Sequence, residues 1–270
     1  CLRLNSALTG SDTLKKNESG AIVLPFDGPV IYEVIRFING KGLFLEDHFR
    51  RLENSFQIEG IENPVDLAAF KEYASVLLSV NEERDCNVKI MSTGKDFVVY
   101  LSKKFYPGPA YYEKGIRTAC IQIERPSPNA KIRRSDYIER IETFKQANEI
   151  FEALLMNAEG YLTEGSKSNL FFVRRGEPGT VYTAPREMVL EGIMRQYVLA
   201  LCAQENISVK FEPIRYSALE EVEALFITGT SINVLPIAKV DEIQYNSPEN
   251  STVLRIMHAF QNYIDTITKG

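Results

Sequence analysis

The stretch YLTEGSKSNLFFV, residues 161–173, is where both the fold and the chemistry of this chain can be read most directly. Its ends are rich in β-forming residues and its middle, GSKS, consists of turn-forming residues. The pattern predicts two strands joined by a tight polar turn. Glu164 stands where the chain reverses, so we expect backbone structure to hold its carboxylate in place. Taken alone, a TEG triplet more often marks a solvated turn. Whether Glu164 has a functional role therefore depends on the other segments of the chain.

Length, composition and charge limit the class of protein. The 270 residues suit one large or two modest domains, and 44% hydrophobic content is enough for well-buried cores. The net charge of -5 comes from interspersed acidic and basic residues, which disfavours nucleic acid and anionic membranes as partners. No apolar run approaches the roughly 18 residues that a membrane span needs.

Cysteine and histidine usage narrows the class further. The four cysteines are scattered without paired spacing, as expected of reduced thiols, so we predict a cytoplasmic protein. Only two histidines are present, which leaves little material for a histidine-rich metal site or a Ser/His/Asp triad. We therefore predict no metal site.

The first half of the chain reads as alternating strands and helices. Residues 31–38 alternate in hydrophobicity and precede the turn residues 39–42, which is a hairpin signal. Residues 1–20 are polar, and we predict no defined structure for them. The remaining elements follow in order: a hairpin return at 43–45, a helix opened by Asp47, a second helix from Asp66, and strands at 88–91 and 97–102.

The second half contains many short strands. Proline and glycine at 107–109 indicate a domain boundary, which predicts a small α+β domain over 1–107 and a larger cofactor-binding domain over 108–270. Because few helices separate the strands, we expect the second domain to be a barrel-like sheet with helices, and the fold class is α+β. The expected elements, besides the strand pair, are strands at 117–124, 181–183, 207–211, 224–228 and 234–240, and helices at 138–147, from about 193, near Ser217–Glu220 with a capping box, and at 253–267.

Several segments in a fixed order resemble a known family, the class IV (fold type IV) pyridoxal-phosphate aminotransferases. This group includes branched-chain and D-amino-acid aminotransferases and aminodeoxychorismate lyase. The similarity covers nearly everything after about residue 26. The segments that carry it are YEVIRFINGKGLFLEDHFRRL at 32–52, Lys131 in NAKIRRSD, EALLMNAEGYLTEGSKSNLFFV at 152–173, GIMRQ at 192–196 and FITGTSINVLPI at 226–237.

The resemblance implies a pyridoxal phosphate site and gives its residues roles. Lys131 is expected to form the Schiff base and to carry protons, and Glu164, supported by Asn169, to hold the ring nitrogen protonated. A helix N-terminus offers free N–H groups to a phosphate. The expected phosphate contacts are the backbone of Ile193 and Met194, where the family commonly has Thr in place of Met194, then Gly229, Thr230 and Ser231, and the side chain of Arg51.

Recognition of the substrate is the least defined part of the resemblance. Arg36 is the candidate for the substrate carboxylate, with Tyr32 lining the same pocket, and Lys89 stands where branched-chain enzymes carry an arginine. Either Asp136 or Tyr137 takes the place of an aromatic residue near the phenolic oxygen of the cofactor.

Three functions remain open on the sequence. The first is transamination between an amino acid, branched-chain-like or of D configuration, and a 2-oxo acid. The second is aminodeoxychorismate lyase activity, which releases pyruvate. The third is a non-catalytic binding or dimerisation protein that keeps the fold. The resemblance also implies a homodimer.

Overall fold

The structure is a computed structural model of the chain. It describes residues 30–102, 105–125 and 127–269, and the short strands β1 (Ala7–Thr9), β2 (Lys15–Lys16) and β3 (Ile22–Val23). The expectation of no defined structure for 1–20 is wrong for β1 and β2, which pair with β7 (Phe97–Ser102) and β3, and the rest of that stretch lies outside the described residues. Two compact units result, Cys1–Phe105 with Ala130–Ser135, and Tyr106–Asn129 with Asp136–Gly270. The sequence suggested a boundary at 107 but not the return of 130–135, which carries Lys131, to the first unit.

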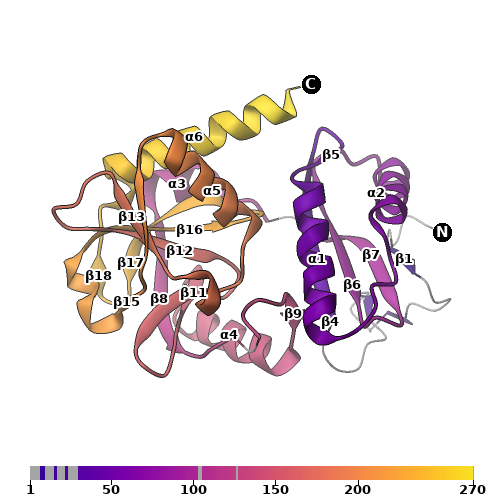
Figure 1. The fold of residues 1–270 in the computed structure, drawn as a ribbon, viewed down its shortest axis with the longest axis horizontal. Helices are drawn as coiled ribbons and strands as arrows, with labels where there is room; N and C mark the ends of the chain where they lie inside the picture. The colour runs from indigo at the N-terminus through magenta and orange to yellow at the C-terminus, as the bar shows by residue number, and fades with distance from the viewer. Residues whose placement is uncertain are drawn as a thin grey trace. The chain divides into compact units, whose positions relative to one another are not determined.

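The first unit is an antiparallel sheet with two helices on one face (Figure 1). The strand order is β1-β7-β6-β4-β5, and β9 also pairs with β4. The elements are β4 (Val30–Ile38), β5 (Lys41–Gly42), α1 (Leu45–Glu59), α2 (Leu67–Asn81), β6 (Cys86–Ser92), β7 (Phe97–Ser102) and β9 (Ile132–Arg133).

Alternation along β4 explains which face the helices cover. Ile31, Ile35 and Phe37 are buried in the core beneath α1 and α2, whereas the residues between Ile31 and Phe37 on the other face are only half-buried. A hairpin after β4 and both helices are confirmed, and the Asp66 side chain caps α2 by accepting from Ala69 N. The expected hairpin return at 43–45 is wrong: β5 is Lys41–Gly42, which pairs with Ile38 and Phe37, so the turn is shorter than predicted. The expected start of the first helix at Asp47 is wrong. The helix begins two residues earlier, because Phe44 in the left-handed region (φ 52°) turns the chain directly from the hairpin into Leu45.

The second unit contains a closed barrel of six strands. The ring runs β12-β16-β17-β8-β10-β11 and closes where Glu164 of β11 pairs with Asn169 of β12. The neighbouring strands β13, β14, β15 and β18 extend this sheet outward. The ring strands are β8 (Ile116–Gln122), β10 (Glu152–Met156), β11 (Tyr161–Gly165), β12 (Asn169–Arg174), β16 (Val222–Gly229) and β17 (Asn233–Val240). The outer strands are β13 (Thr180–Thr183), β14 (Ser208–Phe211), β15 (Ile214–Arg215) and β18 (Ile243–Gln244).

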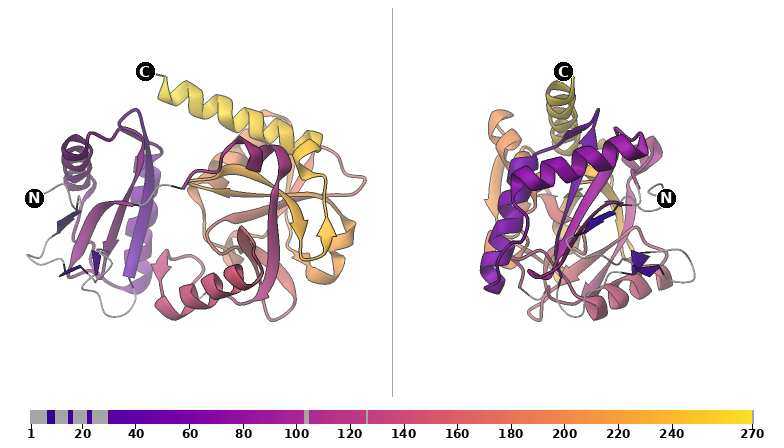
Figure 2. Two further views of the ribbon diagram at one scale, coloured as in Figure 1. Left: turned by 180° about the vertical axis from the view of Figure 1, so that it is seen from behind. Right: turned by 90° about the vertical axis from the view of Figure 1, so that its right-hand side faces the viewer.

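Helices pack on the outside of this barrel. They are α3 (Pro109–Lys114), α4 (Ser135–Ala147), α5 (Ile193–Gln204) and α6 (Ser251–Thr268), with short 3-10 turns at Arg186–Met188, Tyr216–Glu221 and Ser247–Glu249. Figures 1 and 2 show α6 running beside α5, where Tyr197 and Tyr263 stack at 5.6 Å. The capping box expected at Ser217 is wrong, because the segment is a 3-10 turn without a side-chain cap. The α+β class with a barrel-like second half is confirmed.

In the part of the chain that the structure describes, no helix is both long and apolar enough to cross a membrane.

Candidate functional site

A buried carboxylate, Glu33, lies among apolar side chains at the centre of the first unit. It sits on the helix-facing side of β4 and is fully buried. Arg51 of α1 binds it with two bonds, from Nε to Oε1 at 2.6 Å and from a terminal nitrogen to Oε2 at 2.9 Å. His48 Nδ1 lies 2.9 Å from Oε2. Both carboxylate oxygens therefore have hydrogen-bond partners within the core.

The charges in this cluster follow from burial. Burial alone would raise the pKa of Glu33, but the positive charges of Arg51 and Lys131 and the hydrogen bonds from His48 and Arg51 hold it well below its ordinary value. Full burial lowers the pKa of His48, although its bond to Glu33 opposes this. The imidazole is therefore neutral at pH 7, and its contact with Glu33 is a hydrogen bond rather than an ion pair.

Lys131 belongs to this unit and is anchored by its backbone. Its N–H donates to Ser55 Oγ at 3.0 Å, and its carbonyl oxygen accepts from Tyr32 N at 3.1 Å. The ammonium lies over the Tyr32 ring, 5.3 Å from the centroid, and the Lys89 ammonium lies 4.8 Å from the same centroid. The structure thus brings together three residues that the sequence proposed for the site, Tyr32, Lys89 and Lys131.

Arg36 and Arg51, the two other site residues proposed in this unit, lie on opposite faces of the sheet. Arg36 is four residues beyond Tyr32 on β4 and shares its half-buried face, opposite Asn87 of β6. Arg51, expected to bind the phosphate, makes its described contacts with Glu33 on the helix side. The phosphate role of Arg51 stays a prediction.

Glu164 is the corresponding buried carboxylate of the second unit. It is 1% exposed at the end of β11. Oε1 accepts from Arg125 Nε at 2.6 Å, and Oε2 accepts from the Leu190 N–H at 3.2 Å and from Asn169 Nδ2 at 3.4 Å. A carboxylate with a guanidinium and amide donors is an ionised acceptor held in one orientation.

Asn169 connects Glu164 to the start of α5. Its side-chain nitrogen also donates to the Leu190 carbonyl at 2.8 Å. Its Oδ1 lies so close to Gly192, the residue before α5, that a Cβ there would be 1.9 Å away. Within the described chain, no side chain caps this helix, whose first residues, Ile193 and Met194, are buried. Unsatisfied N–H groups of the first turn are suited to bind an anion.

The GTS segment lies beside the same hairpin. Asn169 pairs with Thr228 across the sheet, immediately before Gly229, Thr230 and Ser231. A Cβ on Gly229 would lie 3.5 Å from the carbonyl oxygen of Lys167 in the hairpin turn. The Thr228 hydroxyl is buried and has no hydrogen-bond partner among the described residues. A buried donor of this kind needs a partner, which a bound polar group can supply.

The turn that carries this hairpin is itself held by a buried carboxylate. Glu152 of β10 accepts from the hydroxyls of Ser166 at 2.5 Å and Ser168 at 3.1 Å, and from the Lys167 N–H at 3.3 Å. It also accepts from the N–H of Ala153 at 2.9 Å. Glu152 thus fixes the loop between Glu164 and Asn169.

The sequence did not predict a role for four residues that form the buried hydrogen-bond clusters: Glu33, His48, Arg125 and Glu152. For Glu33 a signal existed, because it is a charged residue at a core-facing position of an alternating strand. For Arg125 there was none, since its partner Glu164 lies 39 residues away. The sequence left Asp136 and Tyr137 open as the residue near the phenolic oxygen of the cofactor. The centroid of the Tyr137 ring lies 5.8 Å from the Arg125 guanidinium.

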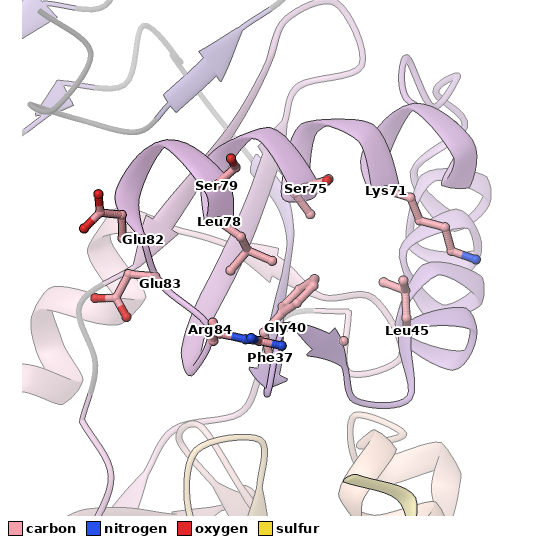
Figure 3. A pocket seen from close by; sticks show the side chains of 12 residues that line it. Phe37, Gly40, Leu45, Lys71, Ser75, Leu78, Ser79, Glu82, Glu83 and Arg84 are labelled. Carbon is pink, nitrogen blue, oxygen red and sulfur yellow. The ribbon is translucent and has the colours of Figure 1, made fainter. Parts of the chain in front are cut away.

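A separate hollow of about 630 Å³ lies on the first unit. Figure 3 shows Lys71, Ser75 and Ser79 along one side of α2, with Phe37 and Arg84 across from them. The residues that line it include none of the proposed site residues. Its mixed charges and exposed walls contrast with the buried carboxylates of the two clusters. Among the described residues, no group of three or more His, Cys, Asp and Glu is placed to hold a metal ion.

Known proteins resemble this chain over most of its length. A protein of Methanocaldococcus jannaschii, provisionally named a branched-chain-amino-acid aminotransferase, is 27% identical over 249 residues, which cover 83% of this chain and 85% of that protein. The aminodeoxychorismate lyase of Bacillus subtilis is 21% identical over 266 residues, covering 89% and 90%.

Solved structures share the fold. The T.th. branched-chain amino acid aminotransferase, complexed with N-(5'-phosphopyridoxyl)-L-glutamate, superposes with a TM-score of 0.75 at 22% identity and covers 88% of this chain and 85% of that one. The family model for amino-transferase class IV matches residues 30–240, which include every proposed site residue. The chain therefore belongs to the class IV aminotransferases.

Proposed function

We propose that this chain is a pyridoxal-phosphate-dependent aminotransferase that moves an amino group between an amino acid and a 2-oxo acid. The observation that carries the proposal is the fixed, ionised carboxylate of Glu164 beside the uncapped start of α5. Relatives of the chain carry aminotransferase names, and the T.th. structure holds a phosphopyridoxyl compound. The amino acid is branched-chain-like or of D configuration.

The residues of the second unit suit a phosphorylated pyridine. Glu164 accepts a hydrogen bond from the ring nitrogen, and Asn169 keeps the carboxylate in place. The amides of Ile193 and Met194 and the GTS residues Gly229, Thr230 and Ser231 bind the phosphate, and the buried hydroxyl of Thr228 lies next to them. In this proposal Arg51 adds a cationic contact to the phosphate. When bound, pyridoxal phosphate supplies an electron sink for charge that develops at the substrate Cα.

Residues of the first unit act on the substrate. Lys131 would hold the cofactor covalently, and its amine would move the proton at the substrate Cα. The negative charge of Glu33 is close enough to interact with Lys131. Tyr32 and Lys89 line the pocket beside Lys131, and Arg36 on the same face of β4 binds the substrate carboxylate.

The visible absorbance of added pyridoxal phosphate tests the covalent role of Lys131. Wild-type protein should develop the band of a lysine-bound cofactor, and Lys131→Ala should not. Lys71→Ala is the control, because Lys71 is an exposed lysine of the same unit that pairs with Glu46. If wild-type protein develops no such band, both enzymatic proposals fail, and a non-catalytic protein of this fold remains.

Aminodeoxychorismate lyase activity is the second candidate, favoured by the B. subtilis relative that covers 89% of the chain. A screen of L- and D-amino acids with 2-oxoglutarate or pyruvate as acceptor separates the two activities. An aminotransferase consumes the acceptor, whereas a lyase releases pyruvate from aminodeoxychorismate without any acceptor. The amino acids that react then define the substrate class.

A further inference from the structure

Arg125, in the loop that follows β8, makes the shortest described contact to Glu164. Its Nε donates to Glu164 Oε1 at 2.6 Å, and a terminal nitrogen donates to the Ser166 carbonyl at 3.0 Å. The two side chains are 9% and 2% exposed. Because the planar guanidinium is fixed by two acceptors, it holds one carboxylate oxygen in a defined position.

Other groups surround Glu164 besides Arg125. The donors to Oε2, Leu190 N and Asn169 Nδ2, are neutral. Arg195 of α5 is near enough to interact with Glu164, but its described hydrogen bond goes to the Ala184 carbonyl. From α4, the Tyr137 ring packs against Arg125. Arg125 is thus a cation bonded directly to this carboxylate.

We propose that Arg125 is a positioning residue that shares Glu164 with the ring nitrogen of pyridoxal phosphate and limits how strongly the carboxylate holds the ring proton. The inference rests on the proposed function, in which Glu164 accepts from that nitrogen. Two cations that share one buried carboxylate each gain less from its charge than either would alone. Arg125 thus adjusts the acidity of the ring nitrogen through its bonds to Glu164 and to the turn that follows it.

The test follows protonation of the ring nitrogen directly. Pyridoxal phosphate labelled with 15N in the ring is bound to each variant, and its chemical shift is recorded against pH. Arg125→Gln removes the charge, so the protonation midpoint should rise by roughly one pH unit or more. Arg125→Lys keeps the charge and should stay close to wild type.

Two results would overturn the inference. One is an unchanged or lower midpoint in Arg125→Gln, and the other is a midpoint in Arg125→Lys that rises as far as in Arg125→Gln. Arg125→Met is a second neutral variant with the same expected direction, for use if Arg125→Gln does not fold. Failure of the proposed function looks different, since wild-type protein itself would then show no lysine-bound cofactor.

Discussion

At the scale of single residues, the buried charges of Glu33 and Glu164 are compensated in the same way. Each carboxylate is bonded to one arginine through Nε, at 2.6 Å in both cases. Removal of one member of such a pair leaves the other charge uncompensated, which typically costs roughly 3 to 5 kcal/mol. These pairs therefore constrain which substitutions the site tolerates.

His48 makes the stability of the protein depend on pH. Its pKa in the folded state is lowered from the ordinary 6.5, so below about pH 6.5 the unfolded chain binds a proton that the folded chain does not. The free energy of unfolding should therefore fall as the pH is lowered from 6.5 toward 5, with a slope of up to about 1.4 kcal/mol per pH unit from this group. Urea denaturation at a series of pH values measures the slope.

His48→Gln should flatten this slope, because glutamine does not titrate and its amide can still donate to Glu33. His258, an exposed residue of α6, provides the matched control, and His258→Gln should keep the wild-type slope. An equal slope in His48→Gln and wild type would show that another group titrates in this range.

At the scale of elements, the turn between β11 and β12 depends on Glu152. Glu152→Ala leaves two serine hydroxyls and an amide of the turn without their acceptor, and each buried unsatisfied group costs about 1 to 3 kcal/mol. We expect a loss of roughly 3 kcal/mol or more in the free energy of unfolding, measured by chemical denaturation. Glu142→Ala removes the exposed partner of the Lys167 side chain and should cost less than about 1 kcal/mol. Similar losses in both variants would contradict the assignment.

Gly192, the residue before α5, packs against Asn169 of β12, and this contact between the two elements leaves no room for a side chain at Gly192. Its φ of -63° suits alanine, so the cost of Gly192→Ala is steric, because the new Cβ displaces Asn169 from its bonds to Leu190 and Glu164. We expect a loss of about 1 to 3 kcal/mol in the free energy of unfolding and weaker binding of pyridoxal phosphate. Chemical denaturation and a titration with the cofactor measure the two effects.

Gly108 is the natural control for this substitution. It precedes α3 as Gly192 precedes α5, its φ is -70°, and no described heavy atom lies within 4 Å of the position that a Cβ would take. Gly108→Ala should change stability by less than about 0.5 kcal/mol. If Gly192→Ala binds the cofactor like wild type, the junction does not support the site as proposed.

At the scale of the whole molecule, the family resemblance predicts a homodimer. Sedimentation equilibrium should give twice the 30.6 kDa of the single chain. Because dimerisation is linked to folding by mass action, the thermal unfolding midpoint should also rise with protein concentration. A mass of 30.6 kDa and a midpoint independent of concentration would rule the dimer out. The cytoplasmic location likewise stays a prediction.

The predictable part of the structure follows from local patterns. Alternation located β4, the turn residues of GSKS located the hairpin, and Asp66 marked the start of α2. The start of α1 was less predictable, because Phe44 adopts a left-handed conformation that its residue type does not suggest. The spacing of the family segments anticipated the grouping of Glu164, Asn169 and the α5 start.

By itself, the sequence determined the α+β class, the family and the residue types available to the site, because periodicity and turn chemistry act over a few neighbouring positions. Only the tertiary structure decided which charges meet. Arg51 reaches Glu33 across 18 positions and Arg125 reaches Glu164 across 39, and neither pairing leaves a local trace. Ion pairs of this kind form where packing removes water from two distant side chains, and burial arises from the assembled fold rather than from any segment of it.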